Sequence, residues 1–131
     1  MTNKKRIESD SLGNIKIDKN KLWGAQTQRS LENFKIGNEK MPLEIIIALG
    51  KQKKAATQTN IQLGVLNKKI GNQIISACNQ IINLNLIDEF PLSVWQTGSG
   101  TQTNMNANEV ISNYIIKKIN GKIGSKKPVH P

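Results

Sequence analysis

The sequence has little cysteine, histidine or aromatic side chain, and no long apolar run. It contains one cysteine, one histidine and an aromatic fraction of 4%. A single cysteine excludes a disulfide framework and is typical of the reducing cytoplasm, where we expect this protein to be located. No apolar stretch approaches the ~20 residues that span a bilayer, and none follows the basic opening residues as in a secretory signal. We therefore expect no membrane partner.

Acidic residues are also scarce: nine Asp and Glu stand against 19 Lys and Arg, so the formal net charge is +10. An excess of this size is compatible with nucleic-acid binding. Every basic residue except Arg6 and Arg29 is a lysine, however, whereas the planar arginine fork is the usual reader of bases and phosphates. The basic and aromatic residues are also scattered along the chain. We expect no nucleic-acid partner, and keep a non-catalytic basic helical binding module as an alternative function.

The chain's 131 residues suit one small domain, residues 1–131, of mainly α class. We expect a disordered basic lead over residues 1–6. An irregular segment should follow over residues 7–24, with a Gly-Asn turn and a short strand at Ile15 and Ile17. The helices are predicted over residues 26–34, from Pro42 onward, from Leu66 to about Leu86, and over residues 102–119.

Apolar spacing predicts which face of each long helix is buried. The predicted buried sets are Ile45, Ala48, Leu49, Ala55 and Ala56 after Pro42; Leu66, Ile70, Ile74, Ala77, Cys78, Ile81 and Leu84 in the next helix; and Ala107, Val110, Ile111, Tyr114 and Ile115 in the last. Gly50 interrupts the first set at a cost of about 1 kcal/mol relative to alanine.

The most informative segment runs from residue 95 to residue 104 and is dense in glycine, hydroxyl and amide side chains. Gly98 and Gly100 can adopt backbone angles that bring N–H groups together, and Thr101 or Thr103 can cap the helix that follows. The free N–H groups and the positive dipole end of a helix favour an anion. The segment therefore predicts a site for a carboxylate or phosphate that is held by neutral donors.

Other motifs narrow the choice of ligand. The segment has no Gly-Lys-Ser/Thr of a nucleotide-binding loop and no third glycine of a dinucleotide fingerprint, and Ser99 does not stand in a Gly-x-Ser-x-Gly elbow. An ordinary Gly-Ser-Gly-Thr would merely cap a helix. Here asparagines continue into the first helical turns at Asn104, Asn106 and Asn108, where asparagine is a poor helix former. Such a conflict between propensity and position is typical of functional sites.

Several segments together resemble the class II (iron-independent) fumarases, in order and over nearly the whole chain. They are Asp-Ser-Leu-Gly at 10–13, Lys-Leu-Trp-Gly-Ala-Gln-Thr-Gln-Arg-Ser at 21–30, Lys-Met-Pro at 40–42, Asp-Glu-Phe-Pro-Leu at 88–92, Trp-Gln-Thr-Gly-Ser-Gly-Thr-Gln-Thr-Asn-Met-Asn at 95–106 and Lys-Pro-Val-His-Pro at 127–131. Aspartate ammonia-lyases are similar but carry Gly and Ala at the positions of Thr97 and Ser99. An ammonia-lyase-type portion is therefore the second alternative.

The resemblance implies an N-terminal lyase domain of the aspartase/fumarase-like fold without its central helical bundle, truncated at the C-terminus. It implies fumarate and L-malate as ligands in the tricarboxylic acid cycle, a homotetramer for the full-length family, and neither metal nor cofactor. The substrate-binding residues it implies are Ser99, Gly100, Thr101, Asn104, Met105 and Asn106. His130 and Pro131 match the start of a His-Pro-Asn-Asp segment that forms a second anion site.

Hydration of an alkene between two carboxylates passes through a carbanion whose charge spreads onto one carboxylate, so donors aimed at that group lower the barrier. A general base and a proton donor are needed as well. The family's catalytic serine loop and central histidine segment do not occur here, and Glu109, close to the loop, is interpreted as a surface or capping residue. We expect no catalytic residue in this chain and no hydratase activity from it alone.

Overall fold

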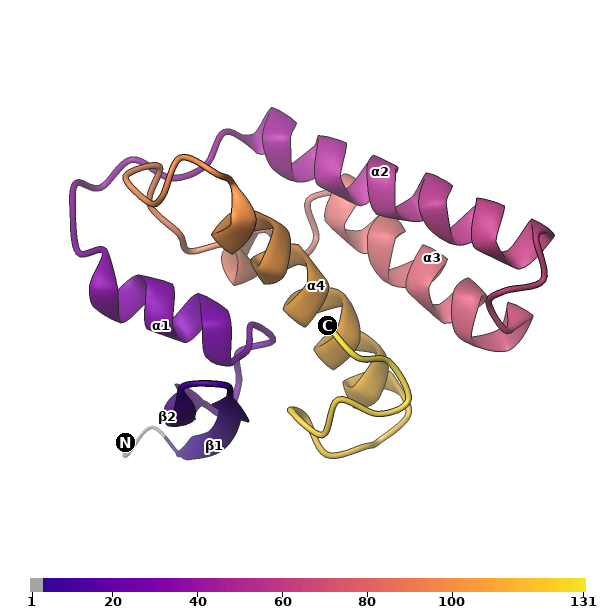
Figure 1. Ribbon diagram of the computed structural model, residues 1–131, viewed down its shortest axis with the longest axis horizontal. Coiled ribbons are helices and arrows are strands. Elements are labelled where there is room, and N and C mark those ends of the chain that lie inside the picture. Colours follow the sequence, from indigo (N-terminus) through magenta and orange to yellow (C-terminus); the bar gives the residue numbers. More distant parts are fainter. Residues whose placement is uncertain (1–3) are drawn as a thin grey trace.

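The structure, a computed structural model, describes residues 4–131. Within them the elements are β1 (Lys5–Asp10), β2 (Gly13–Asp18), α1 (Ala25–Asn33), α2 (Leu43–Gln62), α3 (Lys68–Ile82), the 3-10 turn η1 (Ile87–Glu89) and α4 (Thr101–Lys118). Helices α2 and α3 form an antiparallel pair, and α4 runs between that pair and the layer of α1 and the hairpin (Figure 1). The mainly α prediction is confirmed. No helix in the described range is long and apolar enough to cross a membrane.

The N-terminal segment is more regular than predicted. Strands β1 and β2 pair antiparallel from Lys5 opposite Asp18 to Asp10 opposite Gly13. The turn between them is closed by the N–H of Leu12, which donates to Oδ1 of Asp10 at 2.9 Å, and Gly13 has a φ of +103° that suits glycine. The short strand expected at Ile15 and Ile17 is confirmed as part of β2. Residues 7–10, expected to be irregular, instead lie in β1, because this tight turn lets two strands pair.

The predicted disordered lead is wrong for Lys5 and Arg6, which lie in β1, and residues 1–3 of that lead lie outside the described residues. Arg6 is the main reason for the order. Its Nε donates to Oε1 of Glu8 at 2.8 Å. Its two terminal nitrogens donate to the carbonyl oxygens of Asp18, Lys21 and Trp23, each at 2.7 Å. One guanidinium thus ties β1 to the chain that follows β2. Sequence reasoning missed it because its partners are backbone carbonyls up to 17 residues away.

The predicted buried face of α2 is wrong except for Leu49, which is half-buried against the core. The buried residues are Ile46, Gly50 and Thr57, whereas Ile45 is 47% exposed. Gly50 determines the phase, because a Cβ there would lie 3.0 Å from Cγ1 of Ile82 and 3.2 Å from Cγ2 of Ile81. The glycine that seemed only a cost to helix formation is a point where α2 lies close against α3.

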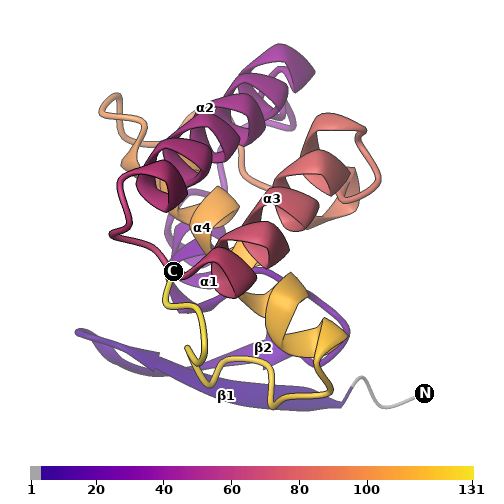
Figure 2. The ribbon, with the colours of Figure 1, turned by 90° about the vertical axis from the view of Figure 1, so that its right-hand side faces the viewer.

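Helix α4 forms the centre of the core, as Figure 2 shows from the side. Ala107, Val110, Ile111 and Ile115 are all buried, as predicted, and Tyr114 is half-buried. They pack with Ile17 and Trp23 from the hairpin side and with Ile46, Cys78, Ile81 and Phe90 from the other. Helix α3 ends at Ile82 rather than near Leu86, because Leu84 turns the chain with a φ of +61°.

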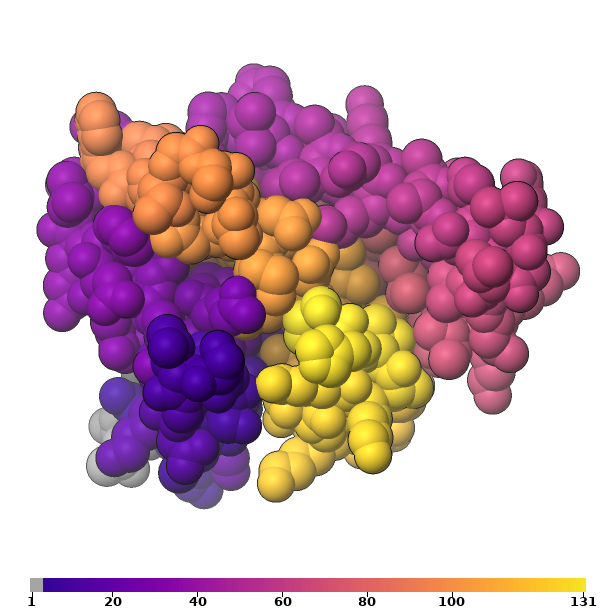
Figure 3. Space-filling view, in the orientation of Figure 1, coloured from indigo at the N-terminus to yellow at the C-terminus, as the bar shows by residue number. Residues whose placement is uncertain are grey.

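The C-terminal segment folds back along α4, so that the chain's end lies over the middle of that helix (Figure 1). The buried amide of Asn113 accepts a hydrogen bond from the N–H of Gly124 at 2.9 Å. The hydroxyl of Ser112 donates to the carbonyl oxygen of Val129 at 2.5 Å. In the space-filling view the segment fills the surface between the hairpin and the α2–α3 pair (Figure 3). Polar residues on α4 therefore position His130 and Pro131.

Candidate carboxylate site

The loop before α4 ends in a left-handed glycine. Gly100 has a φ of +73° and is the N-cap residue of α4, which begins at Thr101. No side chain among the described residues caps the helix, so the prediction that Thr101 or Thr103 would do so is wrong. The turn at Gly100 makes Thr101 the first helical residue, and the hydroxyl of Thr103 donates instead to Oε1 of Gln96 at 3.0 Å.

Most backbone N–H groups at this turn have no acceptor in the described part of the chain. Within residues 4–131, no oxygen accepts a hydrogen bond from the N–H of Ser99, Thr101 or Gln102, while the N–H of Gly100 makes a long 3.5 Å contact with the carbonyl of Thr97. Ser99, Gly100 and Thr101 are also exposed to solvent. Free N–H groups at a helix start attract anions through both hydrogen bonding and the helix dipole.

Hydroxyl groups cluster beside these N–H groups. Ser99 Oγ donates to Thr101 Oγ1 at 3.2 Å and lies 3.4 Å from Thr97 Oγ1, which donates to Oε1 of Gln102 at 2.6 Å. A hydroxyl can rotate its proton. Each of these three hydroxyls can therefore donate to a ligand once its hydrogen bond to the neighbouring side chain is broken. The cluster adds neutral, directional donors to the N–H groups.

Two contacts outside the loop hold it in place. The indole Nε1 of Trp95 donates to Oε2 of Glu39 at 2.9 Å. Hydrogen bonds from the backbone N–H of Glu39 and from this indole lower the pKa of the Glu39 carboxyl. A Cβ at Gly37, whose φ is +62°, would lie 2.7 Å from the Trp95 ring. The loop is therefore fixed to the connection between α1 and α2.

The three predicted residues that follow the loop lie on different sides of α4. Asn104 is half-buried, and its Oδ1 accepts from Lys53 Nζ at 2.8 Å. Met105 lines a small pocket of about 40 Å³. Asn106 is fully buried and donates to the carbonyl oxygen of Glu89 at 2.8 Å. Its side chain is thus committed to the core of this chain.

His130 and Pro131 line two neighbouring hollows. One is the small pocket that includes Met105 and Glu109. The other is a cavity of about 360 Å³, which we call the tail cavity, between α2, α3, α4 and the C-terminal segment; Lys53 and Asn108 also line it. The exposed loop residues Ser99 to Thr101 line neither. The structure therefore places Ser99, Gly100 and Thr101 apart from His130 and Pro131, with α4 running from one to the other, whereas Met105 shares a pocket with the latter two.

Glu109 has a structural role that the sequence interpretation only partly anticipated. It is buried, not on the surface, and it does act as a cap, but for α1. Its carboxylate accepts hydrogen bonds from the N–H groups of Gly24, Gln26 and Thr27 at 2.8 to 3.1 Å and from the Thr27 hydroxyl at 2.6 Å. Burial raises the pKa of Glu109, and these four hydrogen bonds oppose the rise. The sequence feature that could have predicted this capping role is Gly24, because a glycine has no side chain with which to cap its own helix.

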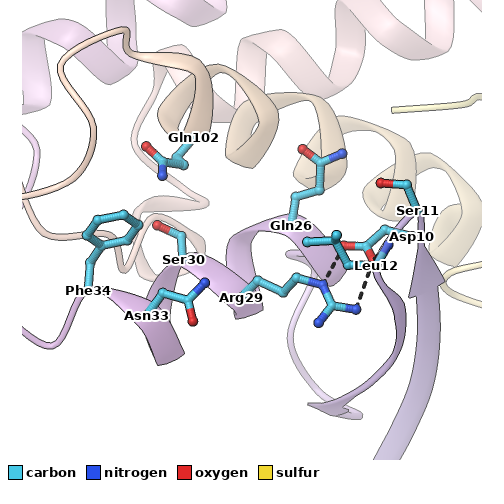
Figure 4. A pocket seen from close by; sticks show the side chains of 9 residues that line it. All are labelled: Asp10, Ser11, Leu12, Gln26, Arg29, Ser30, Asn33, Phe34 and Gln102. Atoms are coloured by element: carbon cyan, nitrogen blue, oxygen red, sulfur yellow. Dashed lines mark hydrogen bonds and ion pairs between the residues drawn. The ribbon is translucent and has the colours of Figure 1, made fainter.

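Arg29 is occupied in another hollow, of about 260 Å³. Its Nε and one terminal nitrogen donate to the two carboxylate oxygens of Asp10 at 2.7 and 2.8 Å (Figure 4), and the same nitrogen donates to the carbonyl of Gly13. Gln102 lines the same hollow. Both arginines of the chain are thus engaged within the fold. No group of three His, Cys, Asp or Glu side chains among residues 4–131 is arranged to hold a metal ion.

Comparison with known proteins gives a family for this arrangement. The family model described as lyase matches residues 13–131. The chain belongs to this lyase family. It is 59% identical over 126 residues to the class II fumarate hydratase of Caulobacter vibrioides and 54% identical over 126 residues to that of Helicobacter pylori. Each alignment covers 96% of this chain, and the Caulobacter alignment covers 27% of the relative.

Solved lyase structures agree. The class II fumarase of Schistosoma mansoni superposes with a TM-score of 0.92 at 43% identity, covering 98% of this chain and 27% of that one. The resemblance to class II fumarate hydratases is thus confirmed, and the fold is that of the N-terminal domain of fumarase/aspartase-type lyases. The chain spans about a quarter of the length of the curated relatives that it matches.

Proposed function

We propose that this chain contributes a carboxylate-binding segment to a fumarate hydratase, with fumarate and L-malate as ligands. The observation that carries the proposal is the helix start at Ser99 to Gln102, where three N–H groups have no acceptor within residues 4–131 and two hydroxyls lie beside them. Neutral donors of this kind bind a carboxylate without placing a fixed positive charge against it.

The same donors suit the reaction of the lyases that this chain resembles. Negative charge accumulates on one carboxylate as the neighbouring carbon becomes a carbanion, so donors already oriented toward that group bind the transition state better than the ground state. We assign this role to Ser99, Gly100 and Thr101, and we keep Asn104, Met105 and Asn106, on different sides of α4, as the further proposed substrate-binding residues. His130 and Pro131 form the start of a second anion site, at the tail cavity.

The chain alone should not turn over substrate. Among its few titratable groups, Glu109 is occupied by four hydrogen-bond donors, and His130 lines hollows that Ser99, Gly100 and Thr101 do not line. The missing acid–base groups would come from the remainder of a longer lyase chain and from its partners in a homotetramer. Monitoring fumarate absorbance with the purified 131-residue protein should show no hydration, and measurable turnover would contradict this part of the proposal.

Ligand binding tests the loop itself. In a titration of the 131-residue protein with L-malate, the backbone amide NMR signals of residues 98–103 should shift. A double variant, Ser99→Ala with Thr101→Ala, should weaken binding about tenfold or more, because two hydroxyl donors are lost. Ser76→Ala, which removes an exposed hydroxyl on α3, is the matched control. Unmoved signals across residues 98–103 would refute the site.

The two alternatives predict other results. An ammonia-lyase-type portion should bind L-aspartate at least as well as L-malate in the same titration. A basic helical module should bind DNA in a salt-dependent manner at physiological ionic strength. The second outcome is disfavoured by the engagement of both arginines with Glu8 and Asp10. A cytoplasmic location remains a prediction from the cysteine content.

A further inference from the structure

One side chain joins the two ends of the loop of residues 97–100, which we call the carboxylate loop. Gln96 directly precedes the loop, and Thr103 lies in the first turn of α4 behind it. The Nε2 of Gln96 donates to the carbonyl oxygen of Ser93 at 2.9 Å, and its Oε1 accepts from the Thr103 hydroxyl at 3.0 Å. Because a backbone carbonyl can only accept a hydrogen bond, the contact with Ser93 determines which end of the amide is the donor.

Both partners of this amide belong to fixed parts of the structure. The Ser93 hydroxyl donates to the carbonyl oxygen of Ile36 at 2.8 Å, and the N–H of Val94 donates to the carbonyl oxygen of Glu39 at 2.9 Å. The connection between α1 and α2 therefore holds the chain just before the loop. Thr103 is buried in α4, the central helix of the core. The amide of Gln96 thus links two rigid supports across the base of the loop.

The carboxylate loop has little else to hold its shape. Residues 97–100 are exposed to solvent, and no atom lies within 4 Å of a Cβ at Gly98 or Gly100. The hydrogen bonds of its side chains within residues 4–131 reach only as far as Gln102. Glycine loses more conformational freedom on ordering than any other residue. Ordering an untied loop around a ligand therefore costs free energy, and a loop that is already ordered binds more tightly.

We infer that Gln96 is a positioning residue for the carboxylate loop. By holding the two ends of the loop together, its amide orients the N–H groups and hydroxyls of Ser99 and Thr101 before a carboxylate arrives. This inference rests on the proposed function, because the ligand is the dicarboxylate proposed above. The competing interpretation is that the two hydrogen bonds of Gln96 only stabilise the fold at the start of α4.

L-malate affinity of the 131-residue protein, measured by calorimetry well below the unfolding temperature, tests the inference. Gln96→Met and Thr103→Val each keep most of the side-chain volume and remove the contact between the two residues, so each should raise the Kd about threefold to tenfold. The double variant should bind no more weakly than the weaker single variant, because both changes remove the same contact. Thr103→Ser keeps the hydroxyl and should bind like the wild type. Gln52→Met, at an exposed position on α2, is the matched control.

Backbone order in the free protein supplies the readout that a purely stabilising role would not change. The amide NMR order parameters of residues 97–100 should fall in Gln96→Met and in Thr103→Val but not in Thr103→Ser. A lowered Tm with unchanged malate affinity and loop order in both variants would overturn the inference and leave the proposed function intact. Additive losses of affinity in the double variant would also overturn it. A wild-type protein that binds no L-malate would overturn the proposed function and this inference with it.

Discussion

The starts of α1 and α4 have similar sequences, but their backbone N–H groups differ in whether they have hydrogen-bond acceptors. Helix α1 begins with Gly-Ala-Gln-Thr from Gly24 to Thr27, and α4 begins with Gly-Thr-Gln-Thr from Gly100 to Thr103. At α1, the buried carboxylate of Glu109 takes up the free N–H groups. At α4, no acceptor among residues 4–131 does so for Thr101 and Gln102. One helix start contains its carboxylate as part of the fold, and the other is open to receive one.

The two helix starts differ in the conformation of the N-cap glycine and in the hydrogen bond of the threonine three residues later. Gly24 is extended, with a φ of −113°, whereas Gly100 is left-handed, with a φ of +73°. The Thr27 hydroxyl donates to the carboxylate of Glu109, but the Thr103 hydroxyl is occupied by Gln96. A ligand at α4 therefore cannot repeat the α1 arrangement in full. The exposed hydroxyls of Ser99 and Thr101 would take the place that Thr27 has in α1.

The comparison also predicts how much the Glu109 carboxylate at the start of α1 contributes to the stability of the fold. Glu109→Ala should be the most damaging single substitution considered for these two helix starts, because it leaves the N–H groups of Gly24 and Thr27 and the Thr27 hydroxyl without their acceptor in the interior. We expect a loss of about 3 kcal/mol or more in the free energy of unfolding, measured by urea denaturation. Glu44→Ala, at an exposed first-turn position of α2, is the control and should cost less than about 0.5 kcal/mol. Equal effects would show that the Glu109 contacts do not stabilise α1.

The two glycines provide the next test. A Cβ at position 24 would lie 2.8 Å from Cδ of Glu109, so Gly24→Ala must displace the capping carboxylate and should cost about 1–3 kcal/mol. The backbone at Gly24 itself can accept alanine, so the loss should largely disappear in the Glu109→Ala background. Additive losses in the double variant would contradict this coupling between the two residues.

Gly100→Ala should cost less and for another reason. No atom lies within 4 Å of a Cβ at this position, but the φ of +73° is unfavourable for any side chain. The expected cost is about 1–2 kcal/mol if the turn persists. L-malate binding should weaken as well, because a relaxed turn would rotate the N–H groups of Thr101 and Gln102. Unchanged malate affinity with lowered stability would separate the turn from the carboxylate site.

The sequence predicted the parts of the fold in which spacing determines burial. In α4, Ala107, Val110, Ile111 and Ile115 form one apolar face between polar residues, so the pattern has a single phase. In α2, the run Ile45-Ile46-Ile47 supports several phases, and contact with α3 at Gly50 selects among them. The position of Glu109 could not be predicted, because its partners are 82 or more residues away. The open loop was predictable, because glycine and hydroxyl residues at a helix start act locally.

The smallest effect on stability should come from the ion pair between Arg29 and Asp10, which holds α1 beside the hairpin. The start of α4 has no corresponding ion pair among the described residues. A hydrogen bond from the Arg29 side chain is the main reason why the pKa of Asp10 lies below its usual value of 3.8. A lowered pKa in the folded state means that the ionised carboxylate favours folding. The stabilisation is therefore present above pH 3.8 and is lost as the pH falls through the folded-state value. Asp10→Asn should lower Tm at pH 7 by less than either glycine substitution, because the pair lies near the surface, and the difference from the wild type should shrink toward pH 2. A difference in Tm that stays constant over this range would mean that Asp10 acts through the turn at Leu12 rather than through Arg29.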